Sequence, residues 1–131
     1  MSEPEIKPDG FADLVGIEWL ELGEEPARAR IAVEPRHQQP YGIVHGGVLT
    51  TLAESLCSAA THVAVAEDGM AAMGQANDTT FLRPIKEGHI TATARPRHRG
   101  RTTWVWDVEM TDDDGRVCAL SRMTIAVRPR R

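Results

Sequence analysis

The feature of this sequence that most constrains its fold is a run from Val48 to about Ala66 in which apolar residues recur at helical spacing. The stripe consists of Val48, Leu49, Leu52, Ala53, Leu56, Ala59, Ala60 and Val63. Such a stripe predicts a helix that buries one side against the rest of the protein. Glu54 is the only Asp, Glu, Lys or Arg residue in the run. The sequence therefore predicts one long core helix that carries a single charge.

On both sides of this helix the apolar residues follow a period of two, which is typical of half-buried strands. Six segments show this period: 16–22, 27–33, 71–82, 89–96, 102–110 and 116–127. Turn-forming residues such as Gly23–Pro26 separate them, and Phe11–Val15 has the length of one helical turn. Pro96 favours an edge or bulge position. This order predicts an α+β fold in which one long helix lies across a curved antiparallel sheet.

The size and ends of the chain indicate a simple organisation. Its 131 residues, 41% of them hydrophobic, are enough for one domain with a core and too few for two, so we expect a single domain over 1–131 with a flexible segment at 1–10. The polar start lacks a secretion signal, and no run of about 18 apolar residues is present. Cys57 and Cys118 lack metal-ligand spacing. We expect a cytoplasmic location, no membrane association, no metal and no cofactor.

The charge distribution bears on the ligand. The net charge is −4, but residues 1–80 carry −9 and residues 81–131 carry +5. Because the chain is acidic overall and has no nucleic-acid-reading motif, we expect no nucleic-acid partner. The basic part could instead bind a small polyanion, the alternative being strand faces rich in solvated arginine.

The face of the predicted helix that bears Glu54 indicates a partner. At 100° per residue Glu54 lies opposite the apolar stripe, with Thr50, Thr51, Ser58 and Thr61 on the same side. A solvated helix face normally carries several charged residues. This face carries only one, so we expect a second copy of the chain to cover it, giving a homo-oligomer.

The turn before the helix has complementary chemistry. Gly46 and Gly47 place backbone N–H groups near a helix N-terminus, where they can bind an oxyanion, although glycines there could simply allow a tight turn or close packing. Gly46 and Glu54 are eight residues apart, which is about 12 Å along a helix. One acyl carbon cannot easily touch both. Glu54 of one subunit should therefore meet Gly46 of another, in an active site shared across a dimer.

These segments resemble the hotdog-fold acyl-CoA thioesterases, which have a GxxHGG turn followed by a helix carboxylate. The resemblance is carried by "VHGGVLTTLAE", "GMAAMGQANDTTFLRPIKEGH", "TTWVWDV" and "SRMTIAVRPRR". It is closest to the 4-hydroxybenzoyl-CoA thioesterase branch of bacterial aromatic degradation and runs from about Gln39 to the C-terminus, while the first 35 residues match only in pattern. It implies a hotdog fold, hydrolysis of an aromatic acyl-CoA to free acid and CoA, and a homotetramer of dimers.

The resemblance also implies site residues. Glu54 matches the catalytic carboxylate, the N–H of Gly46 matches the group that polarises the thioester carbonyl, and Gln39 matches the glutamine that orients the thioester or the attacking water. Ser58 stands where the family has a threonine that positions the water or carboxylate. His45 precedes the glycines as in the family, either as a catalytic group or as a turn-stabilising residue.

Further positions are implied to contact the CoA phosphates. They are Arg83, Thr102 and Arg131, and Arg101 replaces a serine of the branch. A solvated or structural role is the alternative for each of them. Thr103, Trp104, Met73 and Tyr41 could shape an acyl pocket, although such residues on alternating strands are more often part of the core.

The chemistry leaves two mechanisms and two rival functions open. Glu54 can attack the thioester to give a mixed anhydride or can activate water, and the resemblance favours direct attack. A non-catalytic acyl-CoA-binding domain is the alternative function, against which intact Gln39, Gly46 and Glu54 argue. A hydratase would require a catalytic His with an Asp partner, and His62 has no evident one.

Overall fold

A computed structural model describes residues 10–131 of the chain, so the flexible segment expected at 1–10 lies outside the described residues apart from Gly10. The described elements are α1 (Phe11–Val15), β1 (Ile17–Glu21), β2 (Ala27–Ala32), the 3-10 turn η1 (Pro35–His37), α2 (Gly46–Val65), the 3-10 turn η2 (Ala66–Asp68), β3 (Met70–Phe81), β4 (His89–Arg99), β5 (Thr103–Thr111) and β6 (Val117–Pro129).

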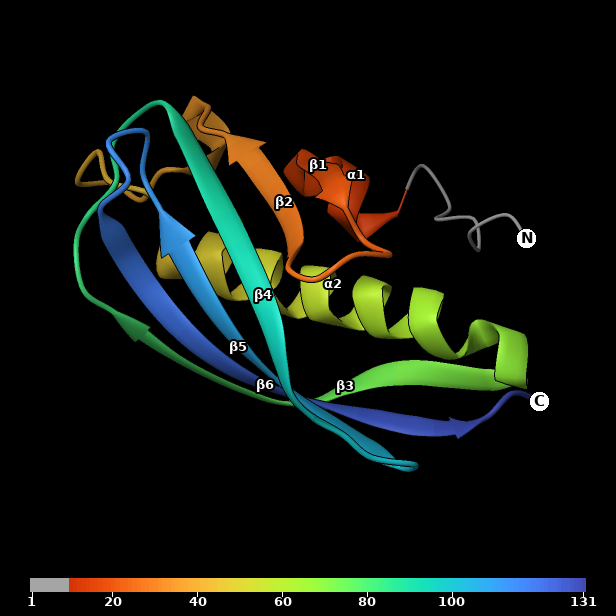
Figure 1. The fold of residues 1–131 in the computed structure, drawn as a ribbon. Helices are drawn as coiled ribbons and strands as arrows, with labels where there is room; N and C mark the ends of the chain where they lie inside the picture. The colour runs from red at the N-terminus through yellow and green to blue at the C-terminus, as the bar shows by residue number, and fades with distance from the viewer. Residues whose placement is uncertain (1–9) are drawn as a thin grey trace.

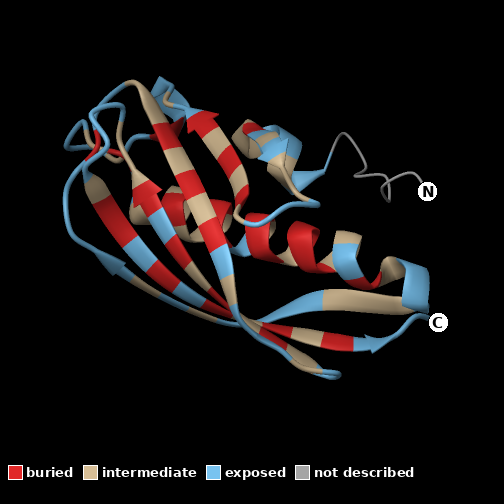
Figure 2. Cartoon of the chain, in the orientation of Figure 1, coloured by how far each residue is buried: buried red, intermediate tan, exposed pale blue. Residues whose placement is uncertain are grey.

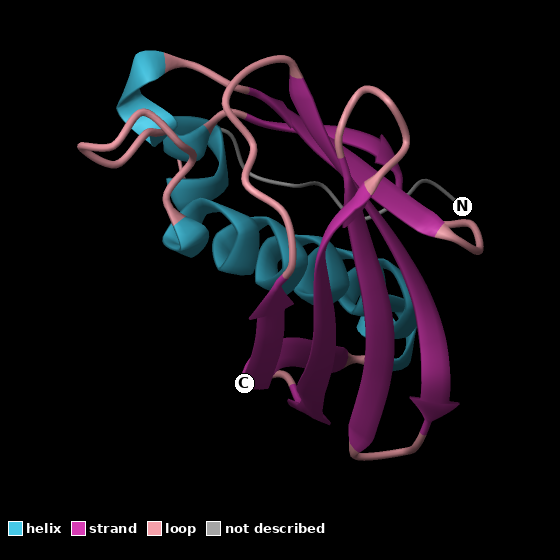
Figure 3. Ribbon diagram, turned by 90° about the vertical axis from the view of Figure 1, so that its left-hand side faces the viewer, coloured by secondary structure: helices cyan, strands magenta, loops and turns pink. Residues whose placement is uncertain are grey.

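The strands form one antiparallel sheet with the order β1-β2-β4-β5-β6-β3. The sheet curls around α2, which lies along its inner side (Figure 1). A view turned by 90° shows the helix on one side of the strands (Figure 3). This arrangement confirms the predicted α+β architecture. Strand β3, which follows α2 and η2 in the chain, lies at the edge of the sheet and beside the helix.

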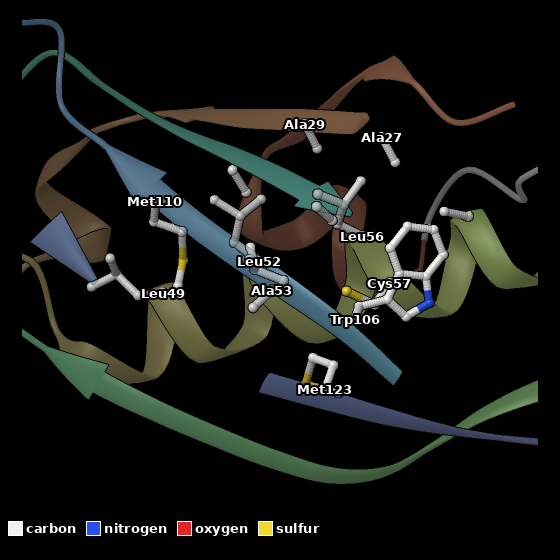
Figure 4. Packing of buried hydrophobic residues seen from close by; sticks show 14 of the residues in the cluster. Ala27, Ala29, Leu49, Leu52, Ala53, Leu56, Cys57, Trp106, Met110 and Met123 are labelled. Carbon is white, nitrogen blue, oxygen red and sulfur yellow. The ribbon is translucent and has the colours of Figure 1, made fainter. Parts of the chain in front are cut away.

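The core lies between α2 and the inner face of the sheet. Leu52 and Leu56 of α2 are fully buried, as are Met110 of β5 and Met123 of β6. Figure 4 shows these side chains between the helix and the strands. Burial alternates along β4 and β5, as the period of two predicts (Figure 2). Most of the predicted stripe of α2 is buried, with Val48 packed against its margin, but Val63 is only half-buried, and Cys57 and Val65 join the buried face.

One residue predicted for the polar face of the helix is also placed differently. Thr61 was expected on the open face with Glu54, but it is fully buried. Its Oγ1 donates a hydrogen bond to the carbonyl of Cys57 at 2.7 Å and accepts one from Nε1 of Trp106 at 2.9 Å. The reason is that β5 brings the Trp106 indole against the second half of α2, and the buried N–H requires an acceptor.

The boundaries of the elements differ from the prediction by a few residues. The long helix starts at Gly46, two residues before the apolar stripe, because His45 supplies its cap. Strand β4 continues past Pro96 to Arg99, and its pairing with β5 shifts register between Pro96 and His98. The bulge expected at this proline is therefore observed inside the sheet.

The segment Gly46–Asp68 is long and apolar enough to cross a membrane by length and composition. Half of its most apolar window is buried inside the domain. Its apolar residues therefore act here as those of a core helix.

Candidate active site

The N-terminus of α2 is built on the turn His45–Gly47. Nδ1 of His45 accepts a hydrogen bond from the N–H of Gly47 at 2.8 Å, so the imidazole caps the helix. This is the turn-stabilising bond considered from the sequence. A Cβ on Gly47 would lie 2.9 Å from the same nitrogen. Glycine at this position therefore leaves room for the capping ring.

Gly46 is the first residue of α2, and its N–H is one of those that a helix leaves without an internal partner. A Cβ on Gly46 would lie 2.9 Å from Cζ of Phe81, at the end of β3. Gly46 does not have a positive φ. A side chain on Gly46 would displace the Phe81 ring, so close packing and an available N–H occur together at this turn.

Gln39, Gly46 and Arg83 line one pocket of about 420 Å³. The other lining residues are mainly apolar: Ile43, Val44, Leu49, Phe81, Leu82, Pro84, Ile85 and Cys118. The fold thus brings an amide side chain, a helix N-terminus and a guanidinium to one apolar pocket. A carbonyl oxygen placed at the N–H of Gly46 would be polarised by the positive end of the helix.

The loop that carries Gln39 is held by hydrogen bonds on both sides. The N–H of Gln39 donates to the carbonyl of Ile43 at 2.8 Å, and Nε2 of Gln38 donates to the carbonyl of Lys86 at 3.0 Å. The carbonyl of His37 accepts the N–H of His45 at 2.9 Å. Gln39 is therefore fixed relative to the start of α2.

His37, which is buried, anchors the loop that carries Gln39. Its Nδ1 accepts the N–H of Glu34 at 2.9 Å, and its Nε2 lies 2.6 Å from the carbonyl of Val15. Since Nδ1 accepts from a backbone donor, Nε2 must carry the proton that reaches Val15. The neutral ring thus ties the end of α1 to the segment before Gln39. Sequence reasoning missed this residue, because its partners are distant in the chain.

Cys118 lines this pocket and carries a thiol, a potential nucleophile. Burial raises the pKa of its thiol, and the charge of Asp112 raises this pKa further. A thiol that resists ionisation is a poor nucleophile. The pocket therefore lacks an activated cysteine.

Glu54 lies two turns further along α2 and is exposed, and it does not line this pocket. Its carboxylate lies against β3, where a Cβ on Gly74 would be 3.0 Å from Oε2. Among the described residues Glu54 has no hydrogen-bond or ion-pair partner in its own chain. Ser58, one turn later, is half-buried. Within one chain the structure therefore keeps Glu54 apart from Gln39 and Gly46.

The residues implied to contact the CoA phosphates lie at the two ends of β3. Arg83 follows one end, while at the other end Met70 pairs with Pro129, close to Arg131. Thr102 lies on the Arg131 side, since its carbonyl accepts the N–H of Val127. A second pocket, of about 630 Å³, is lined there by Ala71, Met73, Arg128, Pro129, Arg130 and Arg131. A twelve-residue strand spans roughly 40 Å, so Arg83 and Arg131 of one chain are far apart.

The residues considered for an acyl pocket have different positions. Trp104 is buried beside Trp106, with ring centroids 5.9 Å apart, and lines a separate pocket of about 310 Å³ at the far half of α2. Tyr41 is 86% exposed, and Met73 lies in the basic pocket near Arg131. The aromatic side chain that lines the pocket of Gln39 and Gly46 is Phe81, which was not considered from the sequence. The sequence gives no signal for it, because a phenylalanine at a strand end is not distinctive until the fold places it.

Comparisons with known proteins give a consistent result. A profile of the family described as the Thioesterase superfamily matches residues 41–119. The crystal structure of a glutamine-to-alanine variant of thioesterase PA1618 from Pseudomonas aeruginosa has a TM-score of 0.89 and 37% identity, covering 93% of this chain and 88% of that chain. The structure of thioesterase HI1161 from Haemophilus influenzae has a TM-score of 0.87 and 33% identity, covering 92% and 84%. The proofreading thioesterase EntH of Cronobacter turicensis is 34% identical over 113 residues, 86% of this chain and 82% of that protein.

Proposed function

We propose, from the premise that this chain belongs to the thioesterase superfamily and is a thioester hydrolase of hotdog fold, that it hydrolyses an aromatic acyl-CoA to the free acid and CoA. The observation that carries the proposal is the pocket shared by Gln39, Gly46 and Arg83. It brings together a helix N-terminal N–H that can polarise a carbonyl, an amide, and a guanidinium that can bind a phosphate.

In this proposal the N–H of Gly46 donates a hydrogen bond to the thioester oxygen, and Gln39 orients the thioester or the attacking water. Glu54 attacks the carbonyl carbon, the C–S bond breaks, and CoA leaves as the thiolate. Water then hydrolyses the mixed anhydride and regenerates the carboxylate. If Glu54 instead removes a proton from water, no anhydride forms. The CoA thiolate is a good leaving group in either case.

The proposed site requires a second subunit. Strand β3 lies at the sheet edge, and an exposed edge strand is a natural place for pairing with another chain. Antiparallel pairing of β3 with β3 of a second copy would place Glu54 near Gly46 of the partner subunit. It would also bring Arg131 of the partner subunit toward Arg83. We therefore propose a dimer with shared sites, two dimers forming a tetramer.

The test is a panel of benzoyl-, hydroxybenzoyl-, phenylacetyl- and medium-chain acyl-CoA, with the released thiol measured. We expect the highest kcat/KM for an aromatic thioester, because residues 39–131 resemble the 4-hydroxybenzoyl-CoA branch and the Phe81 ring lies at the pocket. A clear preference for medium-chain substrates would contradict the aromatic assignment while leaving thioester hydrolysis intact.

The relative EntH is named a proofreading thioesterase, which favours a second candidate, the removal of wrongly loaded acyl groups. Similar kcat/KM values across the whole panel would support this candidate over a dedicated aromatic-CoA hydrolase.

A further inference from the structure

Strand β3 contains a bulge beside Glu54. Its pairing with β6 joins Gly74 to Ile125 and Asn77 to Met123, with a register shift between Gly74 and Ala76. In a regular strand, residues three positions apart point to opposite faces. The extra residue puts Gly74 and Asn77 on one face, the face of the buried Ile125 and Met123. The bulge therefore turns both residues toward α2.

Asn77 uses this orientation to bind the helix. Its Nδ2 donates a hydrogen bond to the carbonyl of Thr50 at 3.0 Å. In an α-helix the carbonyl of Thr50 is also the acceptor for the N–H of Glu54. Asn77 and the N–H of Glu54 thus share one acceptor, the carbonyl of Thr50, so Asn77 holds α2 at the turn that carries Glu54.

The amide of Asn77 is itself held in one orientation. Oγ1 of Thr79 donates to Oδ1 of Asn77 at 2.6 Å and lies 2.6 Å from Oγ of Ser121. Since Oδ1 is occupied as an acceptor, Nδ2 is directed to the carbonyl of Thr50. A polar chain therefore runs from β6 through β3 to α2.

Gly74 completes the arrangement on the side-chain end of Glu54. A Cβ at this position would lie 3.0 Å from Oε2 and 3.3 Å from Cγ of Glu54. The bare strand leaves room for the carboxylate directly beside β3. The same strand thus fixes the backbone of Glu54 through Asn77 and borders its carboxylate at Gly74.

We propose that Asn77, oriented by Thr79 and presented by the β3 bulge, is a positioning residue for Glu54. The inference rests on the proposed function, in which Glu54 is the reacting carboxylate. Asn77 acts through α2 and does not touch the substrate. A misplacement of about 1 Å can reduce a rate by about a hundredfold, so loss of this hydrogen bond should affect turnover more than substrate binding.

The first test replaces Asn77 by leucine, which has a similar shape and no hydrogen-bonding group. We expect kcat to fall by roughly tenfold to a hundredfold while KM stays within about twofold, because the phosphate-binding arginines are elsewhere. The matched control is Asp78→Asn, at the neighbouring position paired with Arg122, and it should leave kcat and KM unchanged. The melting temperature of each variant is measured in parallel.

A second pair of variants keeps Asn77 in place. Thr79→Val removes the hydroxyl that orients the amide, and Thr79→Ser retains it. We expect kcat to fall in the valine variant and to be restored in the serine variant, with KM unchanged in both. This pair decides the question even if the leucine variant does not fold.

A folded Asn77→Leu with wild-type kcat, or equal kcat for the two Thr79 variants, would overturn the inference. Glu54→Gln separates this failure from that of the proposed function. If Glu54→Gln is inactive while the Asn77 and Thr79 variants turn over normally, only the positioning role is wrong. If Glu54→Gln remains active, the part of the proposed function that makes Glu54 the reacting carboxylate is wrong, and the positioning role falls with it.

Discussion

At the scale of single residues, three glycines of the site lie in close contact with neighbouring side chains. Gly46 faces the ring of Phe81, Gly47 faces the imidazole of His45, and Gly74 faces the carboxylate of Glu54. None of the three has a positive φ. Each glycine is therefore a place of close approach, which a sequence cannot distinguish from a flexible turn.

The most direct prediction concerns Glu54. Glu54→Gln should lower kcat by a factor on the order of a thousand while the fold is retained, because it removes the proposed nucleophile or base and keeps the shape of the side chain. Steady-state kinetics on the CoA-thioester panel measure the change, and circular dichroism checks the fold. Near-normal turnover by the folded variant on all substrates would refute the assignment of Glu54.

A second prediction tests the thiol in the pocket. Cys118→Ser should retain kcat, because burial raises the pKa of Cys118 and keeps it un-ionised. The serine hydroxyl can replace the thiol as the donor to the carbonyl of Arg116, which lies 3.4 Å from the sulfur. Kinetics with the best substrate of the panel measure the result. A loss comparable with that of Glu54→Gln would instead identify Cys118 as the nucleophile.

At the scale of elements, the 3-10 turn η1 links α1 to the loop of Gln39. His37→Leu should destabilise the protein by about 2 to 4 kcal/mol, because it leaves the N–H of Glu34 and the carbonyl of Val15 without their buried partner. Urea unfolding measures this difference. Arg36→Met is the control: its exposed guanidinium bridges Leu14 and Glu34, so it should cost about 1 kcal/mol or less. Equal losses for the two variants would show that His37 is not a special anchor.

The elements show how far the sequence could predict the molecule. The long helix, the six strands and the irregularity at Pro96 could be predicted because they depend on local periodicity and backbone chemistry. The structure confirms them. The buried position of Thr61 depends on Trp106, 45 residues away, and the β3 bulge depends on register with β6. Local patterns do not contain such long-range pairings. The family resemblance implies that Gln39 and Gly46 share one site. The packing of the Phe81 ring against Gly46 could be seen only in the folded structure.

At the scale of the whole molecule, Arg83 and the cluster of Arg128, Arg130 and Arg131 lie at opposite ends of β3. Arg83→Ala and Arg131→Ala should each raise KM for CoA thioesters by roughly tenfold, with little effect on kcat, because phosphate contacts are remote from the reacting carbon. A truncated thioester without the nucleotide should be hydrolysed equally well by the variants and the wild type. Equal losses on both substrates would indicate a structural role for these arginines.

The shared active site gives the decisive prediction for the assembly. If Gln39, Gly46 and Glu54 act on one thioester, the separation of Glu54 from the pocket of Gln39 and Gly46 within one chain means that two subunits complete each site. Glu54→Ala and Gln39→Ala chains, each inactive alone, are mixed in equal amounts after reversible dissociation. Half of the dimers are then mixed, and each has one site with both wild-type residues and one with neither.

Random reassociation should therefore recover about a quarter of wild-type activity, by the symmetry of the dimer. Gln39→Ala must first be severely impaired by itself, and chains with different tags must show that subunits have exchanged. Recovery would demonstrate that Gln39 of one subunit acts with Glu54 of the other. If exchange is complete and no activity returns, both residues serve within one chain, and α2 must then move relative to the Gln39 loop to bring them together.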